Sequence, residues 1–409
     1  MSPGDSVLLV VPRWVRDGGV SAHVGASAQA LAAHGTRVAV LTARIESDAA
    51  PPGVTIFHSP ELFNRELPVQ ERLGEALSFE PSIVHLNQLG DPAVVSFLRT
   101  TAPVVISAHG FVACTSGVHY FRPGHECQRA HGPGCVPNLV RCAHTRAPLM
   151  LRGKYALASR ELAALQLADM AVSYSTAVDR HLRINGIAGR RLVPYFPTVA
   201  TAEPSERAGS PRVVFAGRVV ASKGIATLIR AAREVEARFV VCGDGRELPA
   251  MRRLARRLGV EERVEFAGWL EPDALATEFA DASLVAVPSW WPEPFGIVGI
   301  EGFAAGRPAV ASRTGGIGDW LDDGVSGLMV QAGDARGLAV ALNELLADPD
   351  RRRQMGAAGR ATLQARFTRE RHLAAITEAY AAAREAWTQT RPPAKPGPPA
   401  PGARAASPA

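Results

Sequence analysis

The sequence predicts an α/β protein with two domains, each built on a parallel sheet with helices on both faces. The chain has 409 residues, and a single hydrophobic core rarely grows to serve a chain of this length. Short runs rich in Val and Ile alternate with longer helical segments, a pattern typical of buried parallel strands. Hydrophobic residues make up 47% of the chain, which is enough to build two cores.

Short apolar runs in the first half of the chain are candidate strands. They lie at 7–11, 37–41, 83–86, 104–107, 170–173 and 192–193. The clearest helix is expected over 20–33, because Val20, Val24 and Leu31 recur on one helical face. Gly35 follows as a helix-ending residue. Together these elements predict a first Rossmann-like domain over 1–195.

A second set of candidate strands begins after a break in the middle of the chain. They lie at 212–216, 238–242, 263–266, 282–287 and 309–311. The break contains Pro194, Pro197 and the polar run 201–210, which are typical of a linker. A second Rossmann-like domain is therefore expected over 196–367. Because ligands of doubly wound folds bind outside the carboxyl ends of the strands, we expect a site between two facing sheets.

The composition argues against several other classes of protein. No run of about 18 apolar residues is present, and the first residues lack a signal-peptide pattern, so we expect a cytoplasmic protein. The stretch 391–409, rich in Pro, Ala and Gly, is expected to be disordered. A net charge of +6, from 45 basic and 39 acidic residues, is mild, and no basic patch interleaved with aromatics suggests nucleic-acid binding.

One basic run has two interpretations. Arg252–Arg257 has a helical pattern and four arginines in six positions. It fits a solvated helix face, and it also fits a surface that makes weak peripheral contact with an anionic membrane or substrate. The oligomeric state is not predicted by any pattern in the chain.

The stretch 293–301 is the most informative part of the sequence. Glu293 and Glu301 bracket a Gly-containing turn that leads into an apolar segment, so Glu293 is expected on a loop and Glu301 in the first turns of a helix. A helix start offers free N–H groups and a partial positive charge to an anion. Fixed carboxylates can accept hydrogen bonds from hydroxyl groups. This combination suits a ligand that is phosphorylated and rich in hydroxyls, such as a nucleotide-sugar.

Two further motifs fit the same kind of ligand. Arg218 and Lys223 follow a predicted strand that ends at Gly217, which places both cations at a helix start where a diphosphate would bind. Fixed cations there would stabilise a departing diphosphate more in the transition state than in the ground state. Gly18 and Gly19 lie between the first strand and the first helix, where glycine lets the backbone approach a ligand closely.

These motifs together resemble those of family 4 retaining glycosyltransferases, which have the GT-B fold of two Rossmann-like domains facing each other across a cleft. The stretch 293–301 is similar to the E-x7-E motif of that family, and 216–225 resembles its G-R-x4-K-G element. The pair 18–19 resembles its N-terminal glycine loop, and 313–317 resembles its T-G-G-x-x-E/D element, with Asp319 near the usual Glu. The resemblance runs from about Val7 to about Ala381.

The resemblance implies that a sugar is transferred with retention from a nucleoside diphosphate, most often UDP, to a hydroxyl of a glycan, a lipid-linked sugar or a small metabolite. It implies no cofactor for catalysis. Glu301 would bind the ribose, Glu293 the donor sugar, and His109 would lie near the anomeric centre. The catalytic set is then His109, Arg218, Lys223 and Glu293. The donor-binding set is Gly18, Gly19, Gly217, Arg218, Lys223, Gly243, Trp269, Leu270, Glu293, Phe295, Gly296, Ile297, Val298 and Glu301.

The resemblance also implies that a final helix over 368–390 packs back on the first domain. Two rival functions share the expected fold. A nucleotide-sugar epimerase or a pyridoxal-dependent phosphorylase would need an acid–base set or a Schiff-base lysine, and neither is evident in the sequence. A non-catalytic sugar-nucleotide binding module would bind the donor without turnover, and the intact catalytic set argues against it.

A Gly/Pro/His-rich segment holds four of the five cysteines. They are Cys114, Cys127, Cys135 and Cys142. Thiolates suit a structural zinc ion, but no pair has the C-x2-C spacing of a zinc site. Stable disulfides are unusual in a reducing compartment. A structural zinc site, disulfides and free thiols all stay open as interpretations of this segment.

Overall fold

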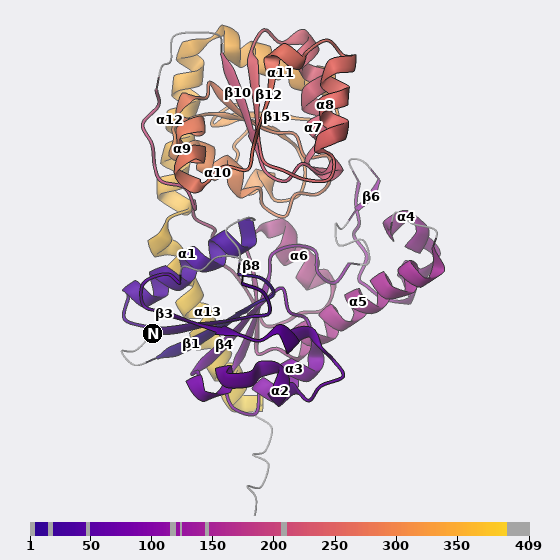
Figure 1. Cartoon of the computed structure of the whole chain (residues 1–409), viewed down its shortest axis with the longest axis vertical. Helices are drawn as coiled ribbons and strands as arrows, with labels where there is room; N and C mark the ends of the chain where they lie inside the picture. The colour runs from indigo at the N-terminus through magenta and orange to yellow at the C-terminus, as the bar shows by residue number, and fades with distance from the viewer. Residues whose placement is uncertain are drawn as a thin grey trace, which may run out of the picture.

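Two α/β domains, one above the other in Figure 1, make up the chain. The structure is a computed structural model, and it describes residues 5–14, 19–45, 50–114, 120–122, 125–143, 147–205 and 211–390. Gly18 and the predicted tail 391–409 lie outside these residues. Both sheets are parallel and have helices on both faces, which confirms the predicted fold class.

The N-terminal domain is built on a seven-stranded sheet of order β3-β2-β1-β4-β5-β8-β9. Its strands are β1 Ser6–Val11, β2 Arg37–Thr42, β3 Val54–His58, β4 Ile83–Asn87, β5 Val104–Ala108, β8 Met170–Ser173 and β9 Arg190–Leu192. Strands β1, β4, β5 and β8 are buried along their whole length. The two edge strands differ from the prediction: β3 was not predicted, and β9 begins two residues before the predicted 192–193 and ends at Leu192.

Helices cover both faces of this sheet. The helices are α1 Gly19–Ala33, α2 Val69–Leu73, α3 Pro92–Leu98, α4 Leu139–Ala143, α5 Pro148–Leu167 and α6 Thr176–Ile184, with 3-10 turns η1 Pro60–Phe63, η2 Gly74–Phe79 and η3 Pro133–Asn138. Asp91 and Ser175 cap α3 and α6 by accepting backbone N–H groups of the first turn. Apolar residues of α1 pack on one face, and those of α2, α3, α5 and α6 pack on the other.

The C-terminal domain repeats this plan on a six-stranded sheet of order β12-β11-β10-β13-β14-β15. Its strands are β10 Arg212–Ala216, β11 Arg238–Cys242, β12 Val264–Gly268, β13 Leu284–Val287, β14 Ala309–Ser312 and β15 Gly327–Val330. Its helices are α7 Ile225–Ala231, α8 Leu248–Arg257, α9 Pro272–Asp281, α10 Ile297–Ala304, α11 Ala335–Ala347 and α12 Pro349–Arg366, with turns η4 Ala221–Lys223, η5 Ala232–Glu234, η6 Glu261–Arg263 and η7 Ile317–Asp319.

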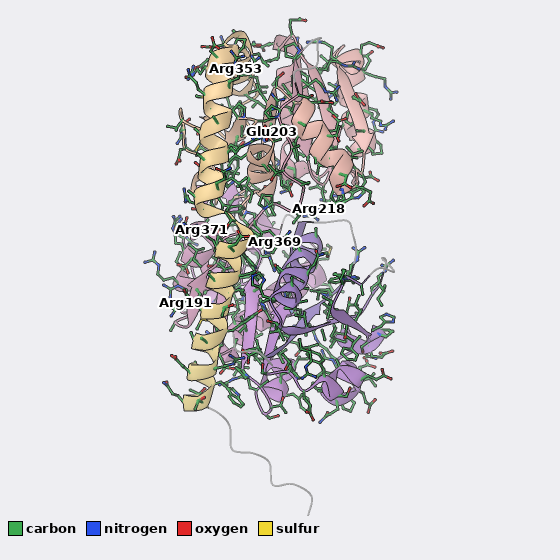
Figure 2. The ribbon with its side chains drawn as sticks, turned by 90° about the vertical axis from the view of Figure 1, so that its left-hand side faces the viewer. Arg191, Glu203, Arg218, Arg353, Arg369 and Arg371 are labelled. Carbon is green, nitrogen blue, oxygen red and sulfur yellow. The ribbon has the colours of Figure 1, made fainter. Side chains whose placement is uncertain are left out.

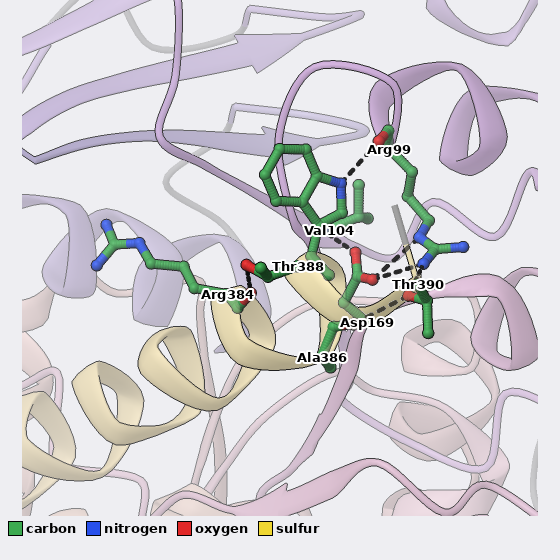
Figure 3. Close-up of polar contacts among 8 residues, drawn as sticks. Arg99, Val104, Asp169, Arg384, Ala386, Thr388 and Thr390 are labelled. Carbon is green, nitrogen blue, oxygen red and sulfur yellow. Dashed lines mark hydrogen bonds and ion pairs between the residues drawn. The ribbon is translucent and has the colours of Figure 1, made fainter. Parts of the chain in front are cut away.

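The last helix, α13 (Arg369–Thr390), leaves the C-terminal domain and packs on the N-terminal one. Figure 2 shows α12 and α13 as a column along one side of both domains. The hydroxyl of Tyr380 lies 2.8 Å from His85 Nδ1 in the N-terminal core. At the far end, Trp387 Nε1 donates to Arg99 O at 2.7 Å, while the Arg99 guanidinium donates to Asp169 at 2.8 Å (Figure 3). The end of the ordered chain therefore helps to hold the first domain.

One segment projects from the N-terminal domain. It contains the short antiparallel hairpin of β6 (Tyr120–Arg122) and β7 (His125–Glu126), then η3, α4 and the start of α5. We call residues 127–143 and 147–157 the arm. Figure 1 shows the arm extending to one side, at the height where the two domains meet. Of the helices in the described ranges, none combines the length and apolar composition that a membrane span requires.

Candidate active site

The carboxyl edges of the two sheets meet around the loop 293–296, which leads into α10. A methyl group placed on Gly110 of the N-terminal domain would lie 3.6 Å from Pro294 Cγ. One placed on Gly19, at the start of α1, would lie 3.8 Å from Ile297 Cγ2. These distances are ordinary contacts, so the loop after β5 lies directly against the loop that carries Glu293, and the first-helix glycine lies against the first residue of α10.

Glu293 is buried beside a lysine. Lys223 Nζ lies 2.7 Å and 2.8 Å from the two carboxylate oxygens, and Ser289 Oγ donates to the same carboxylate at 2.7 Å. Only 4% of Glu293 is exposed. The lysine ammonium also lies 5.8 Å from the centre of the Trp291 ring, within cation–π range. The fold thus joins two predicted catalytic residues that are 70 positions apart in the chain.

The backbone of Glu293 is held by two glycines. Gly316 N donates to Glu293 O at 2.7 Å. A Cβ on Gly315 would lie 2.1 Å from Glu293 O, and one on Gly316 would lie 2.3 Å from Pro294 O. Because backbone atoms cannot move aside cheaply, only glycine fits at these positions. This contact explains why both positions are glycine, although the pair is distant in sequence from the carboxylate that it supports.

The position of Lys223 is set by Gly224, the residue that follows it. Gly224 has a φ of +73°, and a Cβ there would lie 1.8 Å from Pro288 O. The turn η4 can therefore approach the end of β13 closely, and Trp290 N donates to Ser222 O across the same contact at 3.1 Å. This close approach of η4 to the end of β13 places the Lys223 ammonium beside the Glu293 carboxylate.

Arg218 lies on the same connection as Lys223. It directly follows Gly217, whose φ is +140°, and its side chain is exposed. Figure 2 places Arg218 on the side of the C-terminal domain that faces the N-terminal domain. A Cβ on Gly243 would lie 2.0 Å from Gly217 O, so the turns after β10 and β11 touch through glycine. Arg218 therefore adds a positive charge to this edge of the sheet, beside the Lys223 ammonium that is paired with Glu293.

Glu301 lies in α10 and bonds to the linker between the domains. Its Oε1 accepts hydrogen bonds from Thr198 Oγ1 at 2.7 Å and from Thr198 N at 3.4 Å. Burial raises the pKa of this carboxyl, while the bonds from Thr198 act in the opposite direction. The residue predicted to bind ribose thus also ties the linker to the C-terminal domain.

His109 is buried directly after β5, and each of its ring nitrogens has a hydrogen-bond partner. Nδ1 lies 2.9 Å from the hydroxyl of Tyr195, and Nε2 lies 2.9 Å from Asn87 Oδ1. Burial, with a smaller effect of the nearby His372, lowers the pKa of His109 to about 3. The ring is therefore neutral at physiological pH, so it can offer hydrogen bonds and shape but not a positive charge.

The remaining predicted donor residues lie along the same edge of the C-terminal sheet. Gly243 N donates to Gly268 O at 2.6 Å, so the turn after β11 meets the turn that holds Trp269 and Leu270. Trp269 is 44% exposed, and Leu270 is partly buried. The turns after β10, β11 and β12 therefore lie next to one another at this edge of the sheet.

The start of α10 has the geometry of an anion site. Gly296, with a φ of +85°, caps the helix, and Ile297 and Val298 form its first turn. The side chain of Phe295 is buried, and its carbonyl oxygen accepts from Trp320 Nε1 at 2.7 Å. First-turn N–H groups have no partner within the helix.

Sequence reasoning missed the residues that support the predicted ones. Asn87 is the last residue of the buried strand β4 and Ser289 follows the buried strand β13, and that position at a carboxyl strand end could have marked them. Tyr195 and Thr198 lie in the linker, where no local pattern points to His109 or Glu301. Asp319 accepts from Thr176 N at 2.7 Å and Thr176 Oγ1 at 2.5 Å, so it bridges the two domains.

The four cysteines of the Gly/Pro/His-rich segment lie close enough together for three of them to affect the pKa of Cys142. Burial raises the pKa of Cys142 to about 11, and the thiols of Cys114, Cys127 and Cys135 add to this effect. All four are free thiols. Within the described ranges, no three His, Cys, Asp or Glu side chains are arranged to hold a metal ion. Structural zinc at these cysteines therefore stays a prediction.

Metal analysis of the purified protein would test the zinc prediction. If it is right, protein prepared without chelator should carry about one zinc ion per chain, since a structural site takes one ion and four ligands. Cys127→Ser should lose that zinc, while Cys242→Ala, which changes a core thiol of the other domain, should keep it. Wild-type protein free of zinc would contradict the prediction without any variant.

Comparison with known proteins agrees with the architecture. Residues 17–194 match the family described as Glycosyltransferase Family 4, and residues 200–362 match Glycosyl transferases group 1. Among solved structures, sucrose-phosphate synthase from Thermosynechococcus elongatus is similar with a TM-score of 0.70 and 23% identity, over 92% of this chain and 98% of that one. Anabaena HepE in complex with UDP and glucose is similar with a TM-score of 0.67 and 18% identity, over 92% of this chain and 99% of that one. At these identities the likeness shows the fold.

Several curated proteins are also similar to this chain in sequence. Lipopolysaccharide core biosynthesis glycosyltransferase LpsD of Rhizobium meliloti is 40% identical over 45% of this chain and 52% of its own length, so the match spans about half of that relative. D-inositol 3-phosphate glycosyltransferase of Xylanimonas cellulosilytica is 30% identical over 90% of this chain and 92% of its own length. The last match covers nearly all of both chains. The protein belongs to glycosyltransferase family 4 and has the GT-B fold.

Proposed function

We propose that the protein transfers a sugar from a UDP-sugar to a hydroxyl acceptor with retention of the anomeric configuration. The observation that carries this proposal is the bidentate contact of Lys223 with the buried Glu293, next to the open first turn of α10. Cations and helix N–H groups suit a diphosphate, and a fixed carboxylate suits sugar hydroxyls. A similar fold, HepE, has been solved in complex with UDP and glucose, which supports the choice of donor.

In the proposed mechanism the protein stabilises the charge of the leaving group and positions the reactants. As the bond between the anomeric carbon and the diphosphate breaks, negative charge grows on the leaving oxygen, where Arg218, Lys223 and the α10 N-terminus would stabilise it. The acceptor hydroxyl would attack from the same face, and its proton would pass to the departing phosphate oxygen. His109 is neutral and Glu293 is paired with Lys223, so both are suited to hold the sugar.

Closure of the two domains would protect this reaction. The loop 293–296 already contacts Gly110 across the domain boundary, and Asp319 bonds to Thr176 across it. A donor held here would be shielded from water, which limits hydrolysis in place of transfer. We propose that the reaction proceeds without a metal cofactor, because fixed cations stand where a divalent ion would neutralise the diphosphate.

A donor screen tests the proposal directly. UDP-, GDP-, ADP- and dTDP-sugars would be compared for thermal stabilisation and slow hydrolysis, with EDTA present. We expect a UDP-sugar to stabilise the protein most and to be hydrolysed slowly, and the double variant R218A/K223A to lose both effects. Stabilisation by another base would correct the donor, while a need for added metal would contradict the metal-free mechanism.

Glu301→Ala should weaken UDP binding about tenfold, since hydrogen bonds to a charged group are each worth roughly 1.5–3 kcal/mol. Isothermal titration with UDP measures this directly. Glu261→Ala, which changes an exposed glutamate of η6, is the matched control and should bind UDP as the wild type does. Unchanged affinity in Glu301→Ala, with a lowered thermal midpoint, would show that Glu301 serves the linker contact to Thr198 alone.

A further inference from the structure

The arm carries a concentration of exposed apolar side chains. Five of the twelve large hydrophobic residues that are exposed in the described part of the chain belong to it. They are Val136 at 54%, Val140 at 46%, Leu149 at 83%, Met150 at 55% and Leu157 at 47% exposure. Single exposed apolar residues are normal, but a group of them on one projecting segment marks a contact surface.

The helix geometry gathers these side chains into faces. On α5, Leu149 and Leu157 are two turns apart and lie on one side of the helix, with the exposed Arg152 between them. Val136 and Val140 are four positions apart across η3 and α4. Farther along α5, Ala164 and Leu165 are buried in the N-terminal core. The helix is thus anchored at one end and presents an apolar face at the other.

The charge of the arm shows what kind of partner it fits. The arm contains four basic residues and no Asp or Glu, although the whole chain has 45 basic and 39 acidic residues. The four are Arg129, Arg141, Arg152 and Lys154. Two copies of so basic a surface would repel each other, which argues against self-association. Exposed aliphatic side chains among cations fit the boundary between acyl chains and anionic headgroups.

We propose that the arm binds the surface of an anionic lipid bilayer, with Val136, Val140, Leu149 and Met150 inserted among the headgroups and the arm's cations facing lipid phosphates. Binding of this kind needs no membrane-spanning helix. Because the arm projects at the height where the domains meet (Figure 1), a bilayer on that side lies beside the proposed active site. An acceptor carried by a lipid would then be delivered there; this last step rests on the proposed transferase function.

The other basic surface of the protein lacks the apolar component. The helix α8 exposes Arg252, Arg253, Arg256 and Arg257, but its apolar residues Leu254 and Ala255 are buried. It therefore has the character of a solvated helix face. This difference makes α8 a charge-matched control for the arm.

Co-sedimentation of the full chain with vesicles tests the proposal. Vesicles of phosphatidylcholine alone would be compared with vesicles that also contain phosphatidylglycerol, at low and at high salt. We expect binding to the anionic vesicles that weakens with salt. The variant L149S/M150S should lower the vesicle partition coefficient about tenfold or more, and R129E/R152E should do the same. The controls V325S/V340S, an exposed apolar pair of the other domain, and R253E/R256E should bind as the wild type does.

Several results would overturn the proposal. One is wild-type protein that stays in solution with anionic vesicles, and another is loss of binding in R253E/R256E but not in the arm variants. A wild-type dimer that L149S/M150S dissociates would show that a second copy covers the arm. Hydrolysis of the UDP-sugar, measured in every variant without vesicles, separates the two proposals: retained hydrolysis with no vesicle binding rejects the membrane surface alone, and vesicle binding without hydrolysis rejects the transferase alone.

Discussion

Replacing Lys223 with alanine should lower turnover of the UDP-sugar roughly 10²-fold or more, as expected for removing one preorganised charge contact to a transition state. The lysine ammonium is held by both oxygens of Glu293 and lies over the Trp291 ring, so it does not need to be ordered when the donor binds. The loss should appear in kcat more than in KM, because the leaving diphosphate gains charge only as the bond breaks.

The same substitution also leaves a buried carboxylate without its cation. Removing one partner of a buried pair costs roughly 3–5 kcal/mol, although the partial exposure of Lys223 reduces that figure here. Thermal midpoints must therefore be measured beside the rates. The double variant K223A/E293Q removes both charges, and its stability should recover while its turnover stays low. Lys154→Ala, at a lysine of the arm, is the matched control. A K223A enzyme with near-normal kcat would remove Lys223 from the mechanism.

Acidification should destabilise the protein strongly between pH 7.5 and pH 5, because histidines are buried in the N-terminal core without charge. Burial lowers the pKa of His85 and of His109 to about 3 and that of His372 to about 4, and lowers the pKa of His23 well below its usual value. Their rings lie together: the centroids of His23 and His372 are 4.9 Å apart, and those of His23 and His109 are 6.4 Å apart.

The direction follows from proton binding. Below about pH 6.5 the unfolded chain protonates these rings and the folded chain does not, so unfolding takes up protons and stability falls as the pH falls. For the three rings with pKa values of about 3 to 4, the loss by pH 5 is about 2 kcal/mol each, or about 6 kcal/mol together. Glu301 opposes this trend as a single carboxyl with a raised pKa. A loss of this size approaches the whole stability of an ordinary domain.

Denaturant unfolding at several pH values measures the effect. His23 is the best position for a variant, because neither of its ring nitrogens has a hydrogen-bond partner among the described residues, and it packs edge-on against Tyr174 and Tyr195. His23→Phe should fold and should take up about one proton fewer on unfolding at pH 5. A wild-type stability that is flat between pH 7.5 and pH 5 would mean that the rings are protonated in the folded state.

Strands buried on both faces were predictable because they appear as continuous apolar runs. Strands β5, β8, β10 and β11 were placed within a residue of their observed bounds for this reason. The edge strands β3 and β9 of the N-terminal sheet were not predictable in this way. In β9 the residues Arg190 and Arg191 are polar and partly or fully exposed, and β3 is largely unburied, so neither shows the pattern of a buried strand.

The sequence by itself determined the family and the two-domain α/β plan, and it predicted the residues of the candidate site, because glycine turns, helix starts and carboxylates leave local patterns. Only the tertiary structure decided how those residues pair. The contact of Lys223 with Glu293 depends on the close packing of η4 on the end of β13, and the neutral state of His109 depends on burial between Tyr195 and Asn87. Burial and contacts between distant segments arise from the packing of whole elements, which no short stretch of sequence records.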